Sequence, residues 1–145
     1  MVIKTRTNVY NTCYHLVFVT KYRKEIFTNE NMVKYSKKLF NEIAEKHEYT
    51  ILELEVMEDH VHLVVNFHPK HSISNVVRIL KGAFARIWFK QYPETKYKLW
   101  GGHLWTNSYY VGTVGQVSKE TVMEYVKKQL TEYNNGRSRH DSAYD

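Results

Sequence analysis

The sequence predicts an α+β domain of the ferredoxin-like class, in which an antiparallel sheet carries helices on one face. Two observations predict it. Segments with alternating apolar residues and segments with helical apolar spacing follow one another in the order β-α-β-β-α-β, and a further helical segment comes last. The chain of 145 residues is also of the length of one domain, which buries enough surface to fold without disulfides or metals.

The first strand is expected within residues 10–22 and the first helix within residues 29–49. A cap at Thr28 or Asn29 would begin this helix, and Met32, Tyr35, Leu39 and Ile43 follow at helical spacing. In the strand, two sets of side chains alternate between the faces: Tyr14, Leu16 and Phe18 against Cys13, His15, Val17 and Val19.

The next two strands are expected to form an antiparallel hairpin around a turn at Glu58 and Asp59. In the first, "TILELEVM", Leu52, Leu54 and Val56 alternate with two glutamates. In the second, "HVHLVVNF", alternation sends one set to the core and the other to the opposite face: Val61, Leu63, Val65 and Phe67 against His60, His62, Val64 and Asn66.

The second half of the chain predicts two more helices around a short strand region. One helix is capped by Ser72 or Ser74 and must end near Pro93, with an apolar arc of Val76, Val77, Leu80, Phe84, Ile87 and Trp88. "HLWTNSYYVGTVG" supplies one or two strands. The last helix is expected from Ser118 to a stop at Gly136, so that residues 1–136 form a single domain and residues 137–145 a flexible tail.

Composition bears on where the protein is located and on what it binds. The single cysteine, Cys13, excludes an intrachain disulfide and indicates a reducing compartment, and no apolar run is long enough to cross a bilayer; a cytoplasmic location is therefore expected. The formal charge of +6 and twelve tyrosines suit phosphate backbones and stacked bases, although a solvated basic surface explains the charge equally well. No G-x-x-x-x-G-K-[ST] loop for a nucleotide occurs.

The strongest chemical signal is the pair His60 and His62. Residues two apart on a strand share one face at about 6.6 Å, so both imidazoles can reach one metal ion. An ordinary solvent-facing pair is the alternative. In the last helix, Tyr125 and Gln129 stand one turn apart on the same side. A glutamine oxygen there could join the two imidazoles, with the phenol beside them. Alternatively, Tyr125 is a core aromatic and Gln129 a surface residue.

Three segments in this order, "MEDHVHLVV", "LWTNSYYVGTVG" and "VMEYVKKQ", resemble the single-tyrosine HUH transposases of small insertion sequences, of the TnpA-like type. The resemblance covers nearly the whole chain. It implies that His60, His62 and Gln129 are ligands of a divalent ion, Mg²⁺ or Mn²⁺, and that Tyr125 is the nucleophile. Glu58 departs from the pattern, because many members carry proline there.

The resemblance also implies the reaction and the partners. Such an enzyme cleaves and rejoins single-stranded DNA at element ends through a 5′-phosphotyrosine intermediate, and recognises hairpins. It acts as a homodimer in which the tyrosine helix of one subunit completes the site of the other. The loop around Gly112 to Ser118 could serve as the hinge that such an exchange needs. Candidate DNA contacts are Arg78, Lys81, Arg86, Lys90, Lys127 and Lys128, and the aromatics Trp105 and Tyr109.

Three other readings compete with this one. A host-adopted relative that cleaves repeated chromosomal hairpins would use the same four residues. A non-catalytic single-strand-binding module of ferredoxin-like fold would need none of them, although the RNA-recognition signature is absent. A metallohydrolase attacking with water would not require Tyr125.

Overall fold

The computed structural model describes the backbone of residues 3–4, 9–10, 13–113 and 123–129, and the side chains of the last two ranges. Its centre is a four-stranded antiparallel sheet in the order β4-β5-β3-β6, formed by β4 (Thr50–Val56), β5 (His60–Asn66), β3 (Cys13–Val19) and β6 (Tyr110–Thr113). Helix α1 (Glu30–Lys46) connects β3 to β4, and α2 (Ile73–Gln91) connects β5 to β6. This order and connectivity confirm the predicted ferredoxin-like class.

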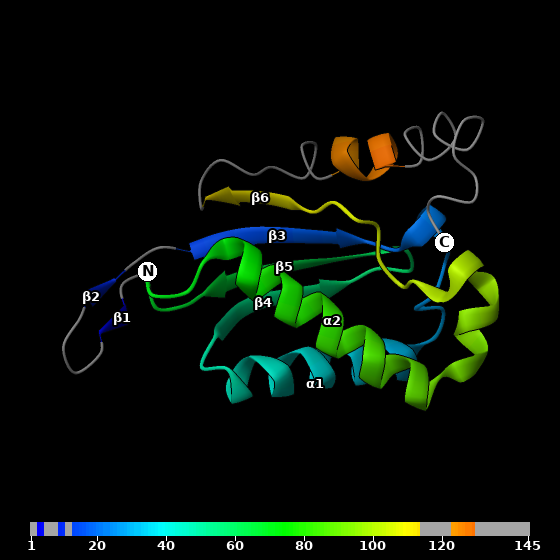
Figure 1. The fold of residues 1–145 in the computed structure, drawn as a ribbon, viewed down its shortest axis with the longest axis horizontal. Helices are drawn as coiled ribbons and strands as arrows, with labels where there is room; N and C mark the ends of the chain where they lie inside the picture. Colours follow the sequence, from blue (N-terminus) through cyan, green and yellow to red (C-terminus); the bar gives the residue numbers. More distant parts are fainter. Residues whose placement is uncertain (1–2, 5–8, 11–12, 114–122, 130–145) are drawn as a thin grey trace.

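Helices cover the two faces of the sheet unequally. Figure 1 shows α1 and α2 on one face, while a short helix at residues 123–129, drawn in orange, lies on the opposite side, near β6. The predicted tyrosine helix therefore exists, and the part that the structure describes contains Tyr125 and Gln129. Its predicted ends at Ser118 and Gly136 and the predicted tail 137–145 lie outside the described residues.

The predicted caps are confirmed. The Asn29 side chain accepts a hydrogen bond from the Met32 amide at the start of α1, and the Ser72 side chain accepts one from the Asn75 amide at the start of α2. α2 ends at Gln91, two residues before Pro93, as the missing amide of proline requires.

The first strand is shorter than predicted. Its expected first residue, Tyr10, belongs instead to β2 (Val9–Tyr10), which pairs with β1 (Ile3–Lys4) in a separate sheet. At the other end Tyr22 and Arg23 have φ values of 60° and 53°. These left-handed conformations cannot continue an extended strand, and the chain turns at the 3₁₀ segment Lys21–Arg23.

The alternation predicted for β4 fails at Leu52. The ladder between β4 and β5 shifts register between Ile51 and Glu53, so Leu52 is the extra residue of a β-bulge. As a result Ile51, with Leu54 and Val56, packs against the main core, and Leu52 does not. The region 103–115 contributes β6, and before it only a single bridge between Trp105 and Thr20.

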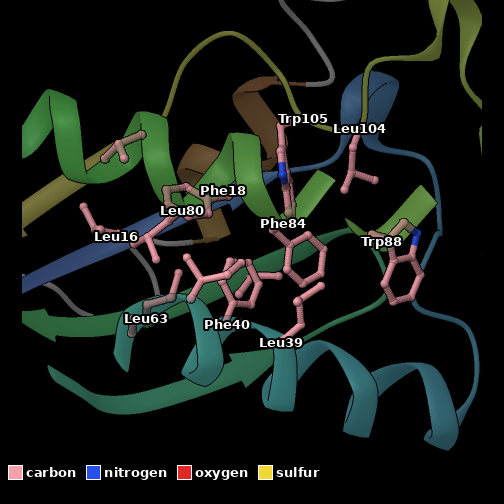
Figure 2. Packing of buried hydrophobic residues seen from close by; sticks show 14 of the residues in the cluster. Leu16, Phe18, Leu39, Phe40, Leu63, Leu80, Phe84, Trp88, Leu104 and Trp105 are labelled. Atoms are coloured by element: carbon pink, nitrogen blue, oxygen red, sulfur yellow. The ribbon is translucent and has the colours of Figure 1, made fainter. Parts of the chain in front are cut away.

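The main core lies between the sheet and the two long helices. It is rich in aromatic rings: Phe40 and Phe84 stack at 4.1 Å between centroids, and Trp88 stacks on Phe84 at 5.7 Å. Figure 2 shows these rings against Leu16, Phe18 and Leu63 of the strands. Trp105 belongs to this core and is 6% exposed, which contradicts its prediction as an exposed DNA contact. Among the residues whose side chains the structure describes, the exposed large aromatics are Tyr97 and Trp100.

Candidate active site

The two histidines lie on the face of the sheet opposite the main core, as predicted. Val61, Leu63 and Val65 of β5 are fully buried in the core, and the alternating residues His60 and His62 point the other way. In the neighbouring strand β3, Val19 pairs with His60 and Val17 with His62. These two valines form a second, small apolar cluster with Val126 of the helix 123–129. We call this side of the sheet the open face.

His60 is held by a carboxylate and an arginine. Its Nδ1 lies 2.8 Å from Oδ1 of Asp59, and Oδ2 of Asp59 accepts a hydrogen bond of 2.7 Å from Nε of Arg23. Burial alone would raise the pKa of Asp59, but the hydrogen bonds from His60 and Arg23 outweigh it and the pKa is lowered. The ionised carboxylate only accepts, so Nδ1 of His60 carries a proton and Nε2 is the ring nitrogen left to face other groups.

His62 has a different partner, His15 of β3. Nδ1 of His15 and Nε2 of His62 are 3.0 Å apart and the two rings stack at 5.2 Å. Burial, followed by the proximity of His15, lowers the pKa of His62, so that its imidazole is neutral at pH 7. Two nitrogens at this spacing either share one hydrogen bond or can both reach a single ion, since metal–imidazole bonds are about 2.0–2.1 Å.

Sequence reasoning missed the roles of Asp59, Arg23 and His15. Asp59 adjoins His60 in the chain, so a carboxylate partner could have been suspected from the order Asp-His. His15 was placed correctly on the face with Val17 and Val19, but its contact with His62 depends on the register between β3 and β5. Single-strand periodicity does not contain that register.

The tyrosine and the glutamine of the helix 123–129 meet at one serine. Oγ of Ser108 lies 3.0 Å from the Tyr125 hydroxyl and donates a hydrogen bond of 2.9 Å to Oε1 of Gln129. The Tyr125 ring also contacts Tyr110 of β6, at 5.7 Å between centroids. Tyr125 is thus half-buried on the open face, and not a residue of the main core.

The open face therefore holds the predicted residues in two groups. His60 and His62 belong to β5, whereas Ser108, with Tyr125 and Gln129, lies beside β6, and β3 runs between them. Neighbouring strands are about 4.8 Å apart, so roughly two strand spacings separate the two groups at the level of the backbone. Within the described residues no group of three or more His, Cys, Asp or Glu side chains has the arrangement of a metal site.

The donor set nevertheless fits a divalent ion. An imidazole whose second nitrogen donates to a carboxylate is the usual form of a metal-binding histidine, and the Asp59–His60 pair has that form. His62 is kept neutral, and the amide oxygen of Gln129 is a hard donor of the kind that Mg²⁺ and Mn²⁺ accept. An open groove of about 840 Å³ lies between the β4–β5 turn and the start of α1; His60 lines it, whereas His62, Tyr125 and Gln129 do not.

The predicted DNA contacts differ in exposure. Arg78, Arg86 and Lys90 of α2 are exposed, as are Lys127 and Lys128 of the helix 123–129. Lys81 is not part of an exposed row, because its ammonium group donates hydrogen bonds to the carbonyl oxygens of Thr106 and Ser108. Tyr109 is half-buried against the main core.

No helix of the described part of the chain is both long and apolar enough to traverse a bilayer.

Comparison with known proteins identifies the family. The family model described as "Transposase IS200 like" matches residues 8–129. The chain is 38% identical over 126 residues to the ISDra2 transposase TnpA of Deinococcus radiodurans, covering 87% of this chain and 89% of that protein. It is 32% identical over 123 residues to the transposase for insertion sequence element IS200 of Salmonella typhimurium, covering 85% and 80%.

Solved structures agree with this assignment. A crystal structure of a Deinococcus radiodurans protein described as a transposase superposes with a TM-score of 0.80 at 37% identity, covering 88% of this chain and 97% of that chain. A REP-associated tyrosine transposase bound to a REP hairpin shares the fold, with a TM-score of 0.50 at 11% identity, covering 87% and 68%. The chain belongs to the IS200-like transposase family.

Proposed function

We propose that this transposase cleaves and rejoins single-stranded DNA at the ends of an insertion sequence, with Tyr125 as nucleophile. The observation that carries the proposal is the Asp59–His60 pair beside His62, on the same face of the sheet as the helix that bears Tyr125 and Gln129. Metal-binding histidines commonly have a carboxylate bonded to their second ring nitrogen, and the Asp59–His60 pair has this form.

The residues of the chain have distinct roles in this reaction. His60, His62 and Gln129 would hold a divalent ion, Mg²⁺ or Mn²⁺, which when bound withdraws charge from a non-bridging phosphate oxygen. The Tyr125 oxygen attacks the phosphorus and forms a phosphotyrosine bond to the 5′ side, while the bond to the 3′ oxygen breaks and leaves a 3′-OH. Because the phosphotyrosine conserves the energy of the phosphodiester, a second 3′-OH can reseal the strand without ATP.

The substrate we propose is a single strand with a hairpin, consistent with the basic chain and with the hairpin to which the REP-associated relative was bound. Exposed Arg78, Arg86 and Lys90 of α2, and Lys127 and Lys128, are candidate phosphate contacts, because such contacts require solvent-accessible cations. A host-adopted enzyme that cleaves repeated hairpins would use the same site, and the presence of palindromes flanking the gene distinguishes the two. A cytoplasmic location accords with either role.

A test of this function is the formation of a covalent protein–DNA adduct. A labelled single-stranded hairpin substrate incubated with Mn²⁺ should give a denaturant-resistant adduct with wild type and none with Tyr125→Phe. Tyr110→Phe is the matched control, because Tyr110 packs directly against Tyr125 and should not be required. Cleavage that persists in Tyr125→Phe would instead indicate a metallohydrolase, and binding without cleavage by wild type a non-catalytic module.

We also propose that the active form is a homodimer in which the tyrosine helix acts in trans. In a single chain the helix 123–129 contacts the sheet of its own chain, with the phenol on the β6 side of β3 and the histidines on the β5 side. Mixing His60→Ala with Tyr125→Phe subunits tests the exchange. Adduct should reappear in the mixture if one subunit supplies the helix and the other the histidines, whereas a site built within one chain would stay inactive.

A further inference from the structure

The helix 123–129 is attached to the sheet by few apolar contacts. Val126 is its one buried residue among those described, and it packs on Val17 and Val19. Tyr125 also packs against Tyr110, at 5.7 Å between ring centroids, so two neighbouring positions of the helix contact the sheet. A polar contact from the sheet at Gln129, one turn further along, limits the rotation of the helix more tightly.

Ser108 provides that contact. Its single hydroxyl bonds to both helix residues, which are one turn apart: Oγ lies 3.0 Å from the phenol of Tyr125 and 2.9 Å from Oε1 of Gln129. An amide oxygen only accepts, so the one proton of Ser108 goes to Gln129, and Tyr125 donates its own proton to Oγ of Ser108. Both donors are used in this arrangement, and two points along the helix are fixed at once.

The backbone that carries Ser108 is itself fixed from several directions, although Ser108 is exposed. The Lys81 ammonium donates to the carbonyl oxygens of Thr106 and Ser108, at 2.7 and 3.3 Å. The Thr106 hydroxyl donates to the same Ser108 carbonyl, at 3.2 Å, and the Thr106 amide donates to the Val19 carbonyl of β3, at 2.9 Å. We call residues 106–108 the serine turn.

Lys81 connects this turn to the rigid part of the molecule. It belongs to α2, on the core side of the sheet, and lies 5.8 Å from the ring centroid of buried Phe18. The turn also follows Trp105, which is anchored in the core. The contacts thus run from the aromatic core through Lys81 and the serine turn to Tyr125 and Gln129.

We propose that Ser108 is a positioning residue for strand transfer, which sets the places of Tyr125 and Gln129 while Lys81 holds the serine turn. The inference rests on the function proposed above, since it assigns a role to Ser108 through those two residues.

The test compares Ser108→Ala with Ser108→Thr, which restores a hydroxyl, and with Asn107→Ala, an exposed change in the same turn. At saturating hairpin DNA with Mn²⁺, Ser108→Ala should slow single-turnover adduct formation roughly tenfold, as the loss of one or two neutral hydrogen bonds predicts. Affinity for the hairpin and melting temperature should not change. Ser108→Thr should recover most of the rate, and Asn107→Ala should keep the wild-type rate.

Lys81→Met tests whether Lys81 holds the serine turn, which we call a buttress, or instead contacts DNA. A phosphate contact would weaken binding and reduce the slope of log K against log salt by about 1. A buttress would leave that slope unchanged and lower the rate at saturating DNA. A changed slope with an unchanged saturating rate would overturn the role of Lys81.

A spectroscopic measurement tests the contact without DNA or metal. In protein labelled with 3-fluorotyrosine, the Tyr125 resonance is assigned by its loss in Tyr125→Phe. It should shift in Ser108→Ala and stay in place in Asn107→Ala. If wild type forms adduct but Ser108→Ala matches it in rate and spectrum, the inference fails while the proposed function stands; if wild type forms no adduct, the proposed function fails and the spectrum still tests the contact.

Discussion

The two faces of the sheet are made by alternate residues of the same strands, yet they follow different rules. On the core face, Leu16, Phe18 and Leu63 are fully buried among aromatic rings and need no specific partner. On the open face, His15, His60 and His62 each depend on one particular neighbour at hydrogen-bond distance. The core face determines whether the chain folds, and the open face determines what the folded chain can do.

This difference has an energetic basis. An apolar side chain gains free energy from burial in almost any direction, so many arrangements of the core satisfy it. A half-buried imidazole is stabilised only if a donor or acceptor meets it, because an unpaired polar group costs about 1–3 kcal/mol. Substitutions on the two faces should therefore separate activity from stability.

The largest effect should follow from removing an imidazole of the open face. His60→Ala and His62→Ala should each lower the rate of adduct formation about 10³-fold or more, because a bound metal ion contributes several kcal/mol to the transition state. Melting temperature should change little by comparison. Exposed His103 is the matched control, and His103→Ala should retain the wild-type rate. If His103→Ala lowered the rate of adduct formation as much as His60→Ala and His62→Ala, the open face would have no special role in activity.

A core substitution should lower stability strongly and the rate of adduct formation only slightly. Phe84 is fully buried between Phe40 and Trp88, and Phe84→Ala leaves a cavity that should cost about 3–5 kcal/mol of unfolding free energy. Urea unfolding measures this loss. The rate of adduct formation per folded molecule, measured well below the new melting temperature, should stay within a few-fold of wild type. A rate loss as large as that of His60→Ala would show that the core also shapes the site.

The same contrast explains what the sequence could predict. The two long helices, one of the two cap candidates named for each, and the core side of β5 follow from local spacing and were predicted correctly. The bulge at Leu52 was not, because it depends on pairing with β5 and leaves no mark on the periodicity of β4.

The sequence could predict only those features of the site that depend on residue spacing within a single strand or helix. His60 and His62 share a face because of their spacing, and Tyr125 and Gln129 share a side of a helix for the same reason. Their partners His15, Arg23 and Ser108 come from distant parts of the chain, so the tertiary fold alone brings them into contact. Lys81 illustrates the limit, because a helical wheel places it with exposed cations while the fold directs its ammonium group to the serine turn.

Removal of the Asp59 carboxylate, which contacts His60, should lower metal affinity by an intermediate amount. Asp59→Asn keeps the shape of the side chain but removes the charge that fixes the His60 tautomer and pairs with Arg23. We expect the affinity for Mn²⁺ to fall about tenfold, the lower end for loss of a partner of a metal-binding histidine. Electron paramagnetic resonance titration of Mn²⁺ in the Tyr125→Phe protein with bound hairpin DNA measures this without turnover. Glu58→Gln, an exposed neighbour, is the control, and an equal loss there would point to general electrostatics.

The smallest predicted effect is on the pH dependence of stability and comes from Lys81. This residue belongs to α2, on the core side of the sheet, and bonds to the serine turn. Burial, followed by repulsion from Lys21, lowers the pKa of Lys81 to about 8, from 10.5 for an ordinary lysine. Between these two pH values the unfolded chain holds more protons than the folded chain, so the stability of the folded state rises with pH. Relative to Lys81→Met, the unfolding free energy of wild type should be level below pH 8 and then rise by about 1–2 kcal/mol toward pH 10.5.

Urea unfolding of both proteins across this pH range isolates Lys81, because the other lysines and the tyrosines titrate in both. Lys90→Met supplies the control, since exposed Lys90 belongs to the same helix and its replacement also removes one lysine. If the difference in unfolding free energy between wild type and Lys81→Met did not change with pH, the ammonium group of Lys81 would be solvated and not buried. In that case the aromatic core and the serine turn would not be joined through a desolvated cation, and the two faces would be coupled only by the strands that they share.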